Sequence, residues 1–208
     1  MAAVKPESTP PRQTLRAERA EVTRRRIVAA ARVLFARDGY GATTLHGIAT
    51  EAGVAVQTVY AVYGSKAGTL AALLDSAVQQ PQAESAFRDA LAQRSAKRRL
   101  DLFARSIRLR WELAGDVVAI HRDASTADPS LRPAVQAVGR TRRNGITALA
   151  RSLEIRLRPG IDVARAAAIL DALTLPEVYA ELVEVQGWTP DQFEAWLAES
   201  LRRQLLRG

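Results

Sequence analysis

The chain has 208 residues, a formal net charge of +8 and no cysteine, which excludes disulfides and thiolate metal sites. Its apolar fraction of 48% and charged fraction of 25% are those of an average soluble protein. No apolar run reaches the roughly 18–20 residues that a membrane span needs, and the proline-bearing start lacks the apolar segment of a secretory signal. We therefore expect a cytoplasmic protein with no cofactor and no metal, whose basic balance favours a polyanionic partner.

Helix-forming residues dominate, and no segment alternates apolar and polar residues as a half-buried strand does, which predicts an all-α fold. The first four expected helices cover residues 23–38, 45–52, 55–62 and 66–78. Thr23 is the expected N-cap of the first helix, and Gly39 follows its end. Thr43 or Thr44 would cap the second helix, and Ser65 would cap the fourth.

Residues 45–62 have the spacing of a helix-turn-helix. Two short helices that cross steeply need a small residue at their contact and a turn residue that tolerates positive φ. Ala49 and Gly53, four residues apart, meet these requirements. Val54 follows the turn, and Val59 begins the buried stripe of the second helix. This unit predicts a DNA-binding domain that reads the major groove.

The stretch from Thr23 to Leu74 resembles the N-terminal domain of the tetracycline-repressor (TetR) family without a gap. The matching residues are Ile27, Ala30, Ala31, Leu34, Phe35, Gly39, Tyr40, Thr43, Thr44, Ile48, Ala49, Ala52, Gly53, Val54, Val59, Tyr60, Tyr63, Ser65 and Lys66. Residues 175–179 and 187–190 also look like a subset of that family. The resemblance implies a helical transcription regulator, usually a repressor, that binds a palindromic operator as a homodimer and is released by a small molecule.

Several residues are candidates for contact with the DNA backbone. The resemblance implies that the Tyr60 hydroxyl contacts a phosphate, although a packing role is the alternative. Lys66 opens the fourth helix, where its ammonium and free backbone N–H groups can meet a phosphate. Thr43 and Thr44 can also donate to phosphate, or serve only as caps.

Base recognition is expected from the exposed start of the third helix, from Val56, Gln57 and Thr58. Gln57 can bond adenine in a bidentate way, and the other two can contact a thymine methyl group. The recognition helix is poor in charge, because alanine and valine stand where the family often has polar residues. Arg24 and Arg25, in the arginine-rich start of the first helix, are candidates for an arm contact or are simply solvated charges.

The expected domains are therefore a flexible basic arm over residues 1–22, a helix-turn-helix domain over 23–80 and a helical ligand-binding and dimerisation domain over 81–208. Pro81 marks the last boundary. The C-terminal helices are expected at residues 83–92, 97–114, 116–126, 130–157, 163–174, 177–186 and 190–206.

A four-helix seam between two subunits is the predicted dimer interface, with intrachain core as the alternative for each helix. Its residues are Ala166, Leu170, Leu173, Phe193, Trp196, Leu197 and Leu201. The candidate lining of a ligand pocket is Phe103, Trp111, His121 and Tyr179. Arg98, Arg99, Arg140, Arg142 and Arg143 are interpreted as solvated.

We expect no enzyme activity, because neither His46 nor His121 lies in a metal or nucleophile motif. Two other DNA-binding functions remain as alternatives. One is a dimer whose C-terminal domain has no small-molecule effector, and the other is an architectural protein that binds DNA without sequence preference. A specific regulator should prefer one palindrome strongly over random DNA at fixed salt, whereas an architectural protein should not.

Overall fold

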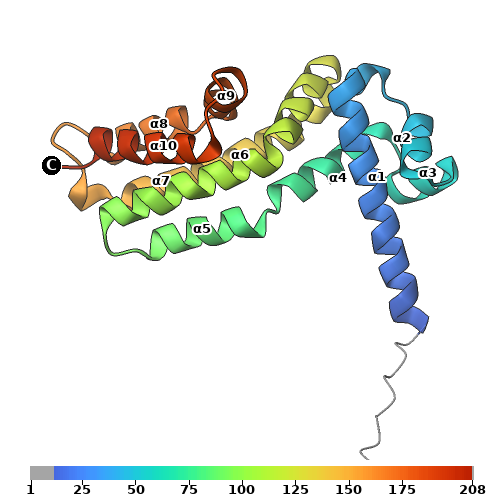
Figure 1. Ribbon diagram of the computed structural model, residues 1–208, viewed down its shortest axis with the longest axis horizontal. Coiled ribbons are helices and arrows are strands. Elements are labelled where there is room, and N and C mark those ends of the chain that lie inside the picture. The colour runs from blue at the N-terminus through green and yellow to red at the C-terminus, as the bar shows by residue number, and fades with distance from the viewer. Residues whose placement is uncertain (1–11, 208) are drawn as a thin grey trace, which may run out of the picture. The chain divides into compact units, whose positions relative to one another are not determined.

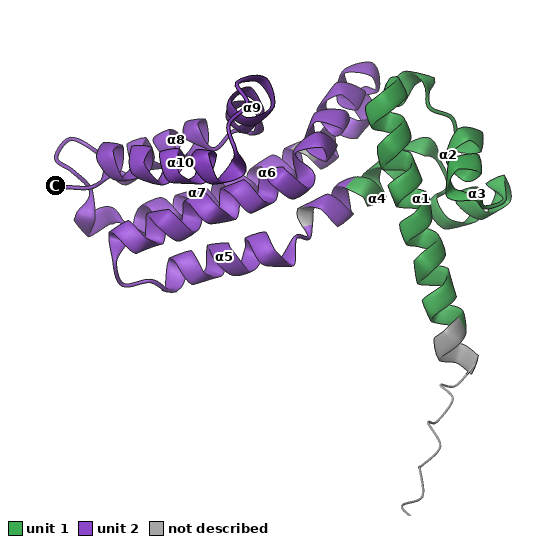
Figure 2. Cartoon of the chain, in the orientation of Figure 1, with its two compact units in different colours: residues 1–73 green, residues 74–208 purple. Residues whose placement is uncertain are grey.

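The computed structural model describes residues 12–207, which form helices joined by short turns (Figure 1). No strand occurs in that part of the chain, so the predicted all-α fold is confirmed. The chain divides into two compact units, residues 1–73 and 74–208 (Figure 2). The division falls between Leu73 and Leu74, inside the fourth helix, whereas the sequence indicated a boundary at Pro81. None of the described helices is long and apolar enough to cross a membrane.

The first unit contains α1 (Arg12–Ala42), α2 (Leu45–Ala52), α3 (Val56–Tyr63) and the start of α4 (Lys66–Val78). Its core joins apolar residues of all four helices, namely Ile27, Ala30, Ala31, Leu34, Phe35, Ile48, Ala49, Ala52, Val59, Leu70 and Leu73. Full burial of each large aliphatic side chain contributes about 1.5–3 kcal/mol, so the short helices are held by packing more than by propensity.

Helix α1 begins earlier than the sequence predicted. Thr23 is not its N-cap, because the Thr23 hydroxyl donates to the Arg19 carbonyl inside the helix, at 2.9 Å. No glycine or proline lies between Arg12 and Thr23 to stop the helix. Residues 12–22, expected in the flexible arm, are therefore helical, and residues 1–11 lie outside the described residues.

The second unit contains α5 (Pro81–Ala92), α6 (Ala96–Ala127), α7 (Arg132–Ser152), α8 (Val163–Leu173), α9 (Pro176–Ala180) and α10 (Pro190–Leu205). Short turns η1 (Pro129–Leu131), η2 (Glu154–Arg156) and η3 (Glu181–Val185) link some of them, the last as one turn of π-helix. The sequence predicted two helices where α6 runs as one. Gly115 lies inside α6, and buried residues on both sides of it, from Leu100 to Ala124, offset the roughly 1 kcal/mol that a mid-helix glycine costs.

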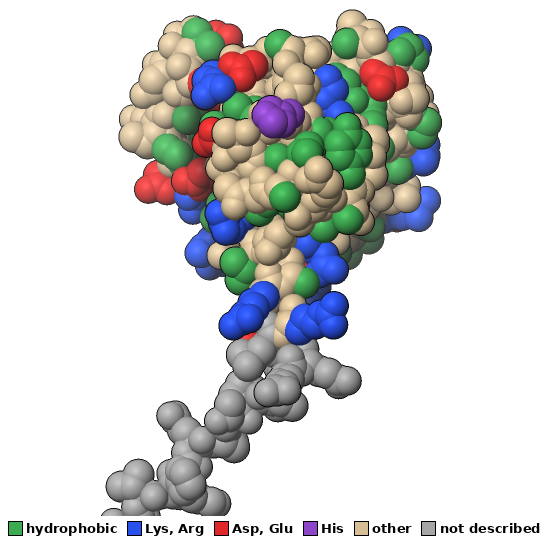
Figure 3. Space-filling view, turned by 90° about the vertical axis from the view of Figure 1, so that its right-hand side faces the viewer, with side chains coloured by type: hydrophobic (Ala, Val, Ile, Leu, Met, Phe, Trp, Pro, Cys, Tyr) green, Lys and Arg blue, Asp and Glu red, His purple; other side chains and the backbone are tan. Residues whose placement is uncertain are grey.

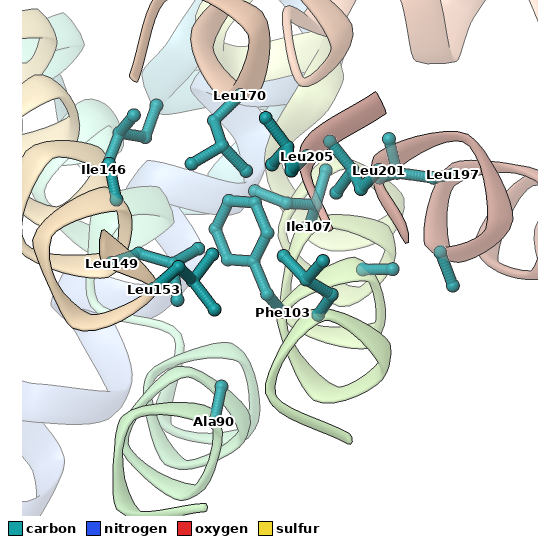
Figure 4. Close-up of a cluster of buried hydrophobic side chains, with 14 of the residues drawn as sticks. Ala90, Phe103, Ile107, Ile146, Leu149, Leu153, Leu170, Leu197, Leu201 and Leu205 are labelled. Carbon is teal, nitrogen blue, oxygen red and sulfur yellow. The ribbon is translucent and has the colours of Figure 1, made fainter. Parts of the chain in front are cut away.

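Phe103 of α6 lies at the centre of the core of the second unit (Figure 4). Aliphatic side chains of α7, α8 and α10 surround its ring, including Ile146, Leu149, Leu153, Leu170, Leu197, Leu201 and Leu205. An isolated bridge between Leu157 and Leu206 fastens the end of α10 to the turn after α7. The second unit is thus a helical bundle with one continuous core.

Candidate DNA-binding surface and ligand cavity

The turn between α2 and α3 depends on Gly53, which adopts the left-handed conformation at φ 62° and ψ 43°. Its N–H donates to the Thr50 carbonyl at 3.1 Å, and the Val54 N–H donates to the Ala49 carbonyl at 3.0 Å. Ala49 and Val59 are buried where the two helices meet. These residues form the scaffold that the sequence spacing indicated.

Helix α1 is fastened to the turn of the helix-turn-helix and to the end of α3. The Arg26 guanidinium donates to the Gly53 carbonyl at 3.4 Å, and the Tyr63 hydroxyl donates to the Arg24 carbonyl at 3.2 Å. A Cβ at Gly53 would lie 2.7 Å from an Arg26 nitrogen. Arg26 therefore packs against the turn itself, a structural role that the sequence did not reveal because an arginine run carries no signal of its partners.

The two threonines before α2 have different roles. Thr44 is the N-cap of α2, and its hydroxyl accepts from the Gly47 N–H at 3.0 Å. Its side chain is exposed. Thr43 is only 4% exposed and donates to the Gly39 carbonyl at 2.8 Å. Of the two candidates for phosphate contact, only Thr44 is at the surface.

Lys66 contacts the end of α1. Its ammonium donates to the carbonyls of Tyr40, Gly41 and Thr43 at 2.6, 3.2 and 3.0 Å, and lies 4.3 Å from the centre of the Tyr40 ring. An ammonium has three donors, so these bonds use all of them. A phosphate at Lys66 would have to replace one of these carbonyls or use backbone N–H groups at the start of α4.

The polar groups of α3 face solvent at its first turns. Gln57 and Tyr60 are exposed, Tyr60 by 55%, while Val56 and Thr58 are half-buried. Figure 3 shows this side of the protein as mostly uncharged at its centre, with both acidic and basic side chains at its margins and basic side chains along the helix below. Base recognition by this surface would rely on Gln57 and on apolar contacts rather than on arginine or lysine.

Arg24 and Arg25 are exposed on α1 rather than in a flexible arm. Both reach the Glu21 carboxylate, at 3.5 and 3.1 Å. Exposed pairs of this kind contribute at most about 1 kcal/mol, so the two arginines can exchange this partner for a phosphate at little cost.

The second unit contains a cavity of about 550 Å³ that is partly open to solvent, within the size range of small-molecule sites. Three of the four predicted residues, Phe103, Trp111 and His121, line it. Tyr179 does not, because its ring packs edge-on against Phe193 with centroids 4.9 Å apart. Trp111 is fixed by a bond from its indole N–H to the Thr174 carbonyl at 3.1 Å.

Three charged residues of the lining were not predicted: Glu84 of α5, Arg110 of α6 and Arg142 of α7. Arg142, interpreted as solvated, instead donates to the Asp171 carboxylate and to the Thr174 hydroxyl. Arg99 is likewise part-buried and bonded to backbone carbonyls, whereas Arg98, Arg140 and Arg143 are exposed. The sequence did offer one indication that Arg110 lines the cavity. Arg110 lies four residues before Ala114, on the same helix face as His121.

Burial lowers the pKa of His121, which is 1% exposed and has no hydrogen-bond partner on either ring nitrogen among the described residues. Burial likewise lowers the pKa of Arg110 and of Arg142. No group of three or more histidine and carboxylate side chains in residues 12–207 is arranged to hold a metal ion.

The predicted dimer residues lie mostly inside their own chain. Ala166, Leu170, Phe193, Leu197 and Leu201 are completely buried there. Leu173 and Trp196 are half-buried against the same core. The five buried side chains have no surface to offer a second subunit, because α8 and α10 turn these faces toward α6 and α7.

Residues 27–73 match the family model for bacterial regulatory proteins of the tetR family. The fold is similar to that of NalD, the secondary repressor of the MexAB-OprM multidrug efflux pump in Pseudomonas aeruginosa. The TM-score is 0.70 at 26% identity, over 91% of this chain and 98% of that one.

Two further solved structures share the fold at 22% identity. One is a complex of SmeT with triclosan, with a TM-score of 0.72 over 89% of this chain and 92% of that one. The other is a putative TetR-family transcriptional regulator from Mesorhizobium loti, with a TM-score of 0.69 over 91% and 99%. A comparison with curated protein sequences finds no match.

Proposed function

We propose that this chain, whose residues 27–73 match the family model for bacterial regulatory proteins of the tetR family, is a repressor that binds a palindromic operator as a homodimer. A small-molecule effector would release it from the DNA. NalD, which shares the fold, is itself described as a repressor.

The observation that carries the DNA-binding proposal is the firmly held helix α3 with exposed polar groups. Val59 and Gly53 fix the helix from behind, while Gln57 and Tyr60 face outward. An α-helix with exposed side chains at its start fits the major groove, where a glutamine can read adenine. We infer that Gln57 reads a base, that Val56 and Thr58 contact its neighbours, and that Tyr60 and Thr44 bind phosphates.

The outer faces of α8 and α10 are the proposed dimer surface. Ala164, Ala168 and Ala172 of α8 are exposed and follow one another at intervals of four residues, opposite the buried Ala166 and Leu170. Small residues on one face allow close approach of a second helix, and two helices from each subunit form a four-helix seam. The half-buried side chains of Leu173 and Trp196 border this surface.

The cavity supports release by an effector over the alternative of a dimer without one. Its volume of about 550 Å³ and the unpaired nitrogens of buried His121 indicate space and polar groups for a ligand. SmeT, a neighbour in fold, is known as a triclosan complex.

The test is selection of bound sequences from a random DNA pool, followed by titration of the selected palindrome against a scrambled duplex of the same length at one salt concentration. A specific regulator should prefer the palindrome by about 10³-fold or more. Equal affinity for the two duplexes would favour an architectural protein. Gln57→Ala should weaken binding to the palindrome by about tenfold and leave the scrambled duplex unaffected.

The dimer is tested separately by light scattering of the wild type and of Ala168→Arg. The variant places a charge at the centre of the proposed surface and should be monomeric at micromolar concentration. Ala195→Arg, at an exposed position of α10, tests whether that helix shares the interface. A dimer that persists in both variants would move the interface elsewhere.

A further inference from the structure

Arg110 lines the cavity of the second unit, and among residues 12–207 no hydrogen bond or ion pair joins another residue to its guanidinium. We propose that this cavity binds an elongated, mainly apolar molecule with one anionic group, of which an alkyl carboxylate is the simplest, and that Arg110 holds the anionic group. The inference deepens the proposed function, because it names the chemical class of the effector.

The shape of the cavity follows α6. Its lining includes residues of this helix from Phe103 to His121, which at 1.5 Å per residue extends over about 27 Å. Arg110 lies near the middle, and His121 lies about 16 Å beyond it along the axis. Between these two residues the helix presents Trp111, Ala114 and Val118. A long molecule with an apolar body fits such a space better than a compact polar one.

Arg110 is the cation best placed to receive an anion. It is half-buried, and no hydrogen bond or ion pair joins its guanidinium to another residue in the described part of the chain. Desolvation lowers its pKa, although a guanidinium stays protonated at neutral pH. A positive charge withdrawn from water and left unpaired is costly, and an incoming carboxylate relieves that cost with bidentate bonds.

The other charges around the cavity do not replace that anion. Glu84 is the carboxylate that acts on Arg110, but it is exposed and lies beyond the distance of an ion pair. Arg142 is already paired with Asp171 and adds positive potential at Arg110. The lining therefore has two guanidinium groups against one exposed carboxylate, which disfavours a cationic ligand.

His121 supplies a second, neutral polar contact. Its two unpaired nitrogens are one donor and one acceptor in the neutral ring, and burial lowers its pKa, which favours that form. A hydroxyl or carbonyl oxygen at the far end of the ligand can bond with it. The anionic group belongs at Arg110, since a neutral imidazole offers only a single donor.

The experiment titrates decanoate, decan-1-ol and decyltrimethylammonium into the full-length protein, with binding measured by calorimetry and by tryptophan fluorescence, which Trp111 reports from the cavity wall. Decanoate should bind about tenfold or more tightly than decan-1-ol, as expected for a hydrogen bond to a charged group, and the cation should bind most weakly. Equal binding of acid and alcohol, tighter binding of the cation, or binding of none of the three would overturn the inference.

Arg110→Gln should abolish the preference for decanoate and leave the affinity for decan-1-ol unchanged. Arg105→Gln is the matched control, because Arg105 is an exposed residue of the same helix outside the cavity and carries the same charge. Arg110→Lys retains the charge and should retain part of the preference, so the inference stays testable if the glutamine variant does not fold. Preference retained in Arg110→Gln, or lost in Arg105→Gln, would contradict the assignment.

Binding is measured without DNA, so the two proposals fail separately. If decanoate is preferred but no palindrome is selected, the regulator proposal fails and the cavity assignment stands. If the palindrome is bound specifically and the preference for the acid is absent, the ligand class is wrong and the regulator proposal stands.

Discussion

Lys66→Met separates a structural role of this lysine from a role in phosphate binding. The substitution keeps the apolar stem and removes the ammonium, which donates to the carbonyls of Tyr40, Gly41 and Thr43. The exposed Gly41 can turn to water, but Tyr40 is half-buried and Thr43 is buried. Loss of a charged partner costs about 1.5 kcal/mol or more for each of these two carbonyls. We therefore expect the free energy of unfolding to fall by about 3 kcal/mol.

The assay is denaturant unfolding combined with DNA binding at several salt concentrations. If Lys66 only holds the end of α1, the variant should lose stability, and the slope of log K against log salt should stay that of the wild type. Tyr60→Phe is the contrasting control, because its exposed hydroxyl should affect DNA affinity and not stability. Unchanged stability in Lys66→Met together with a slope reduced by about one would refute the structural role and support a phosphate contact.

Three further predictions concern other residues. Gly68→Ala should destabilise the protein by about 1–3 kcal/mol in denaturant unfolding, because a Cβ there would lie 2.1 Å from the Tyr63 carbonyl oxygen. Gly115→Ala should instead stabilise the protein by about 1 kcal/mol, because a Cβ there would lie 3.9 Å from its nearest neighbour, the Cβ of Trp111. His121 binds a proton more readily in the unfolded chain, near its ordinary pKa of 6.5, than in the folded one, where burial lowers the pKa. Stability should therefore fall on acidification below that value, by at most about 1.4 kcal/mol per pH unit, and His121→Leu should remove this component; an identical pH profile in the variant would contradict it. Changing Arg24 and Arg25 together to Ala should flatten the salt dependence of DNA binding by about two phosphate contacts, and an unchanged slope would exclude them.

The helix-turn-helix was predictable because its determinants are local. Gly53 adopts a left-handed conformation, Thr44 caps the first turn of α2, and Ala49 and Val59, ten residues apart, are both buried. Errors arose where a local signal competes with packing. Thr23 is a residue type that often caps a helix, but no glycine or proline lies between Arg12 and Thr23 to stop α1. Gly115 is a residue type that often ends a helix, but buried residues of α6 lie on both sides of it.

The exposure of side chains in the second unit could not be predicted, because it depends on which helices pack against one another. A stripe of small and apolar residues such as Ala166 and Leu170 suits an intrachain core and a dimer seam equally well, and only the tertiary arrangement decides. The same limit applies to charge. Arg142 and Arg143 are neighbours in sequence, yet their side chains point about 100° apart on the helix, so that one meets Asp171 and the other meets solvent.

The cavity extends this limit to ligand recognition. The aromatic and histidine residues of α6 signal an apolar face by their spacing, and three of the four predicted residues do line the cavity. Its charge is not visible in that pattern, because Glu84, Arg110 and Arg142 come from three helices that meet only in the fold. Whether a cation is unpaired depends on the residues that surround it in the fold and not on a sequence motif. The class of ligand is therefore better inferred from the groups left without partners around Arg110 and His121 than from the residues that identify the family.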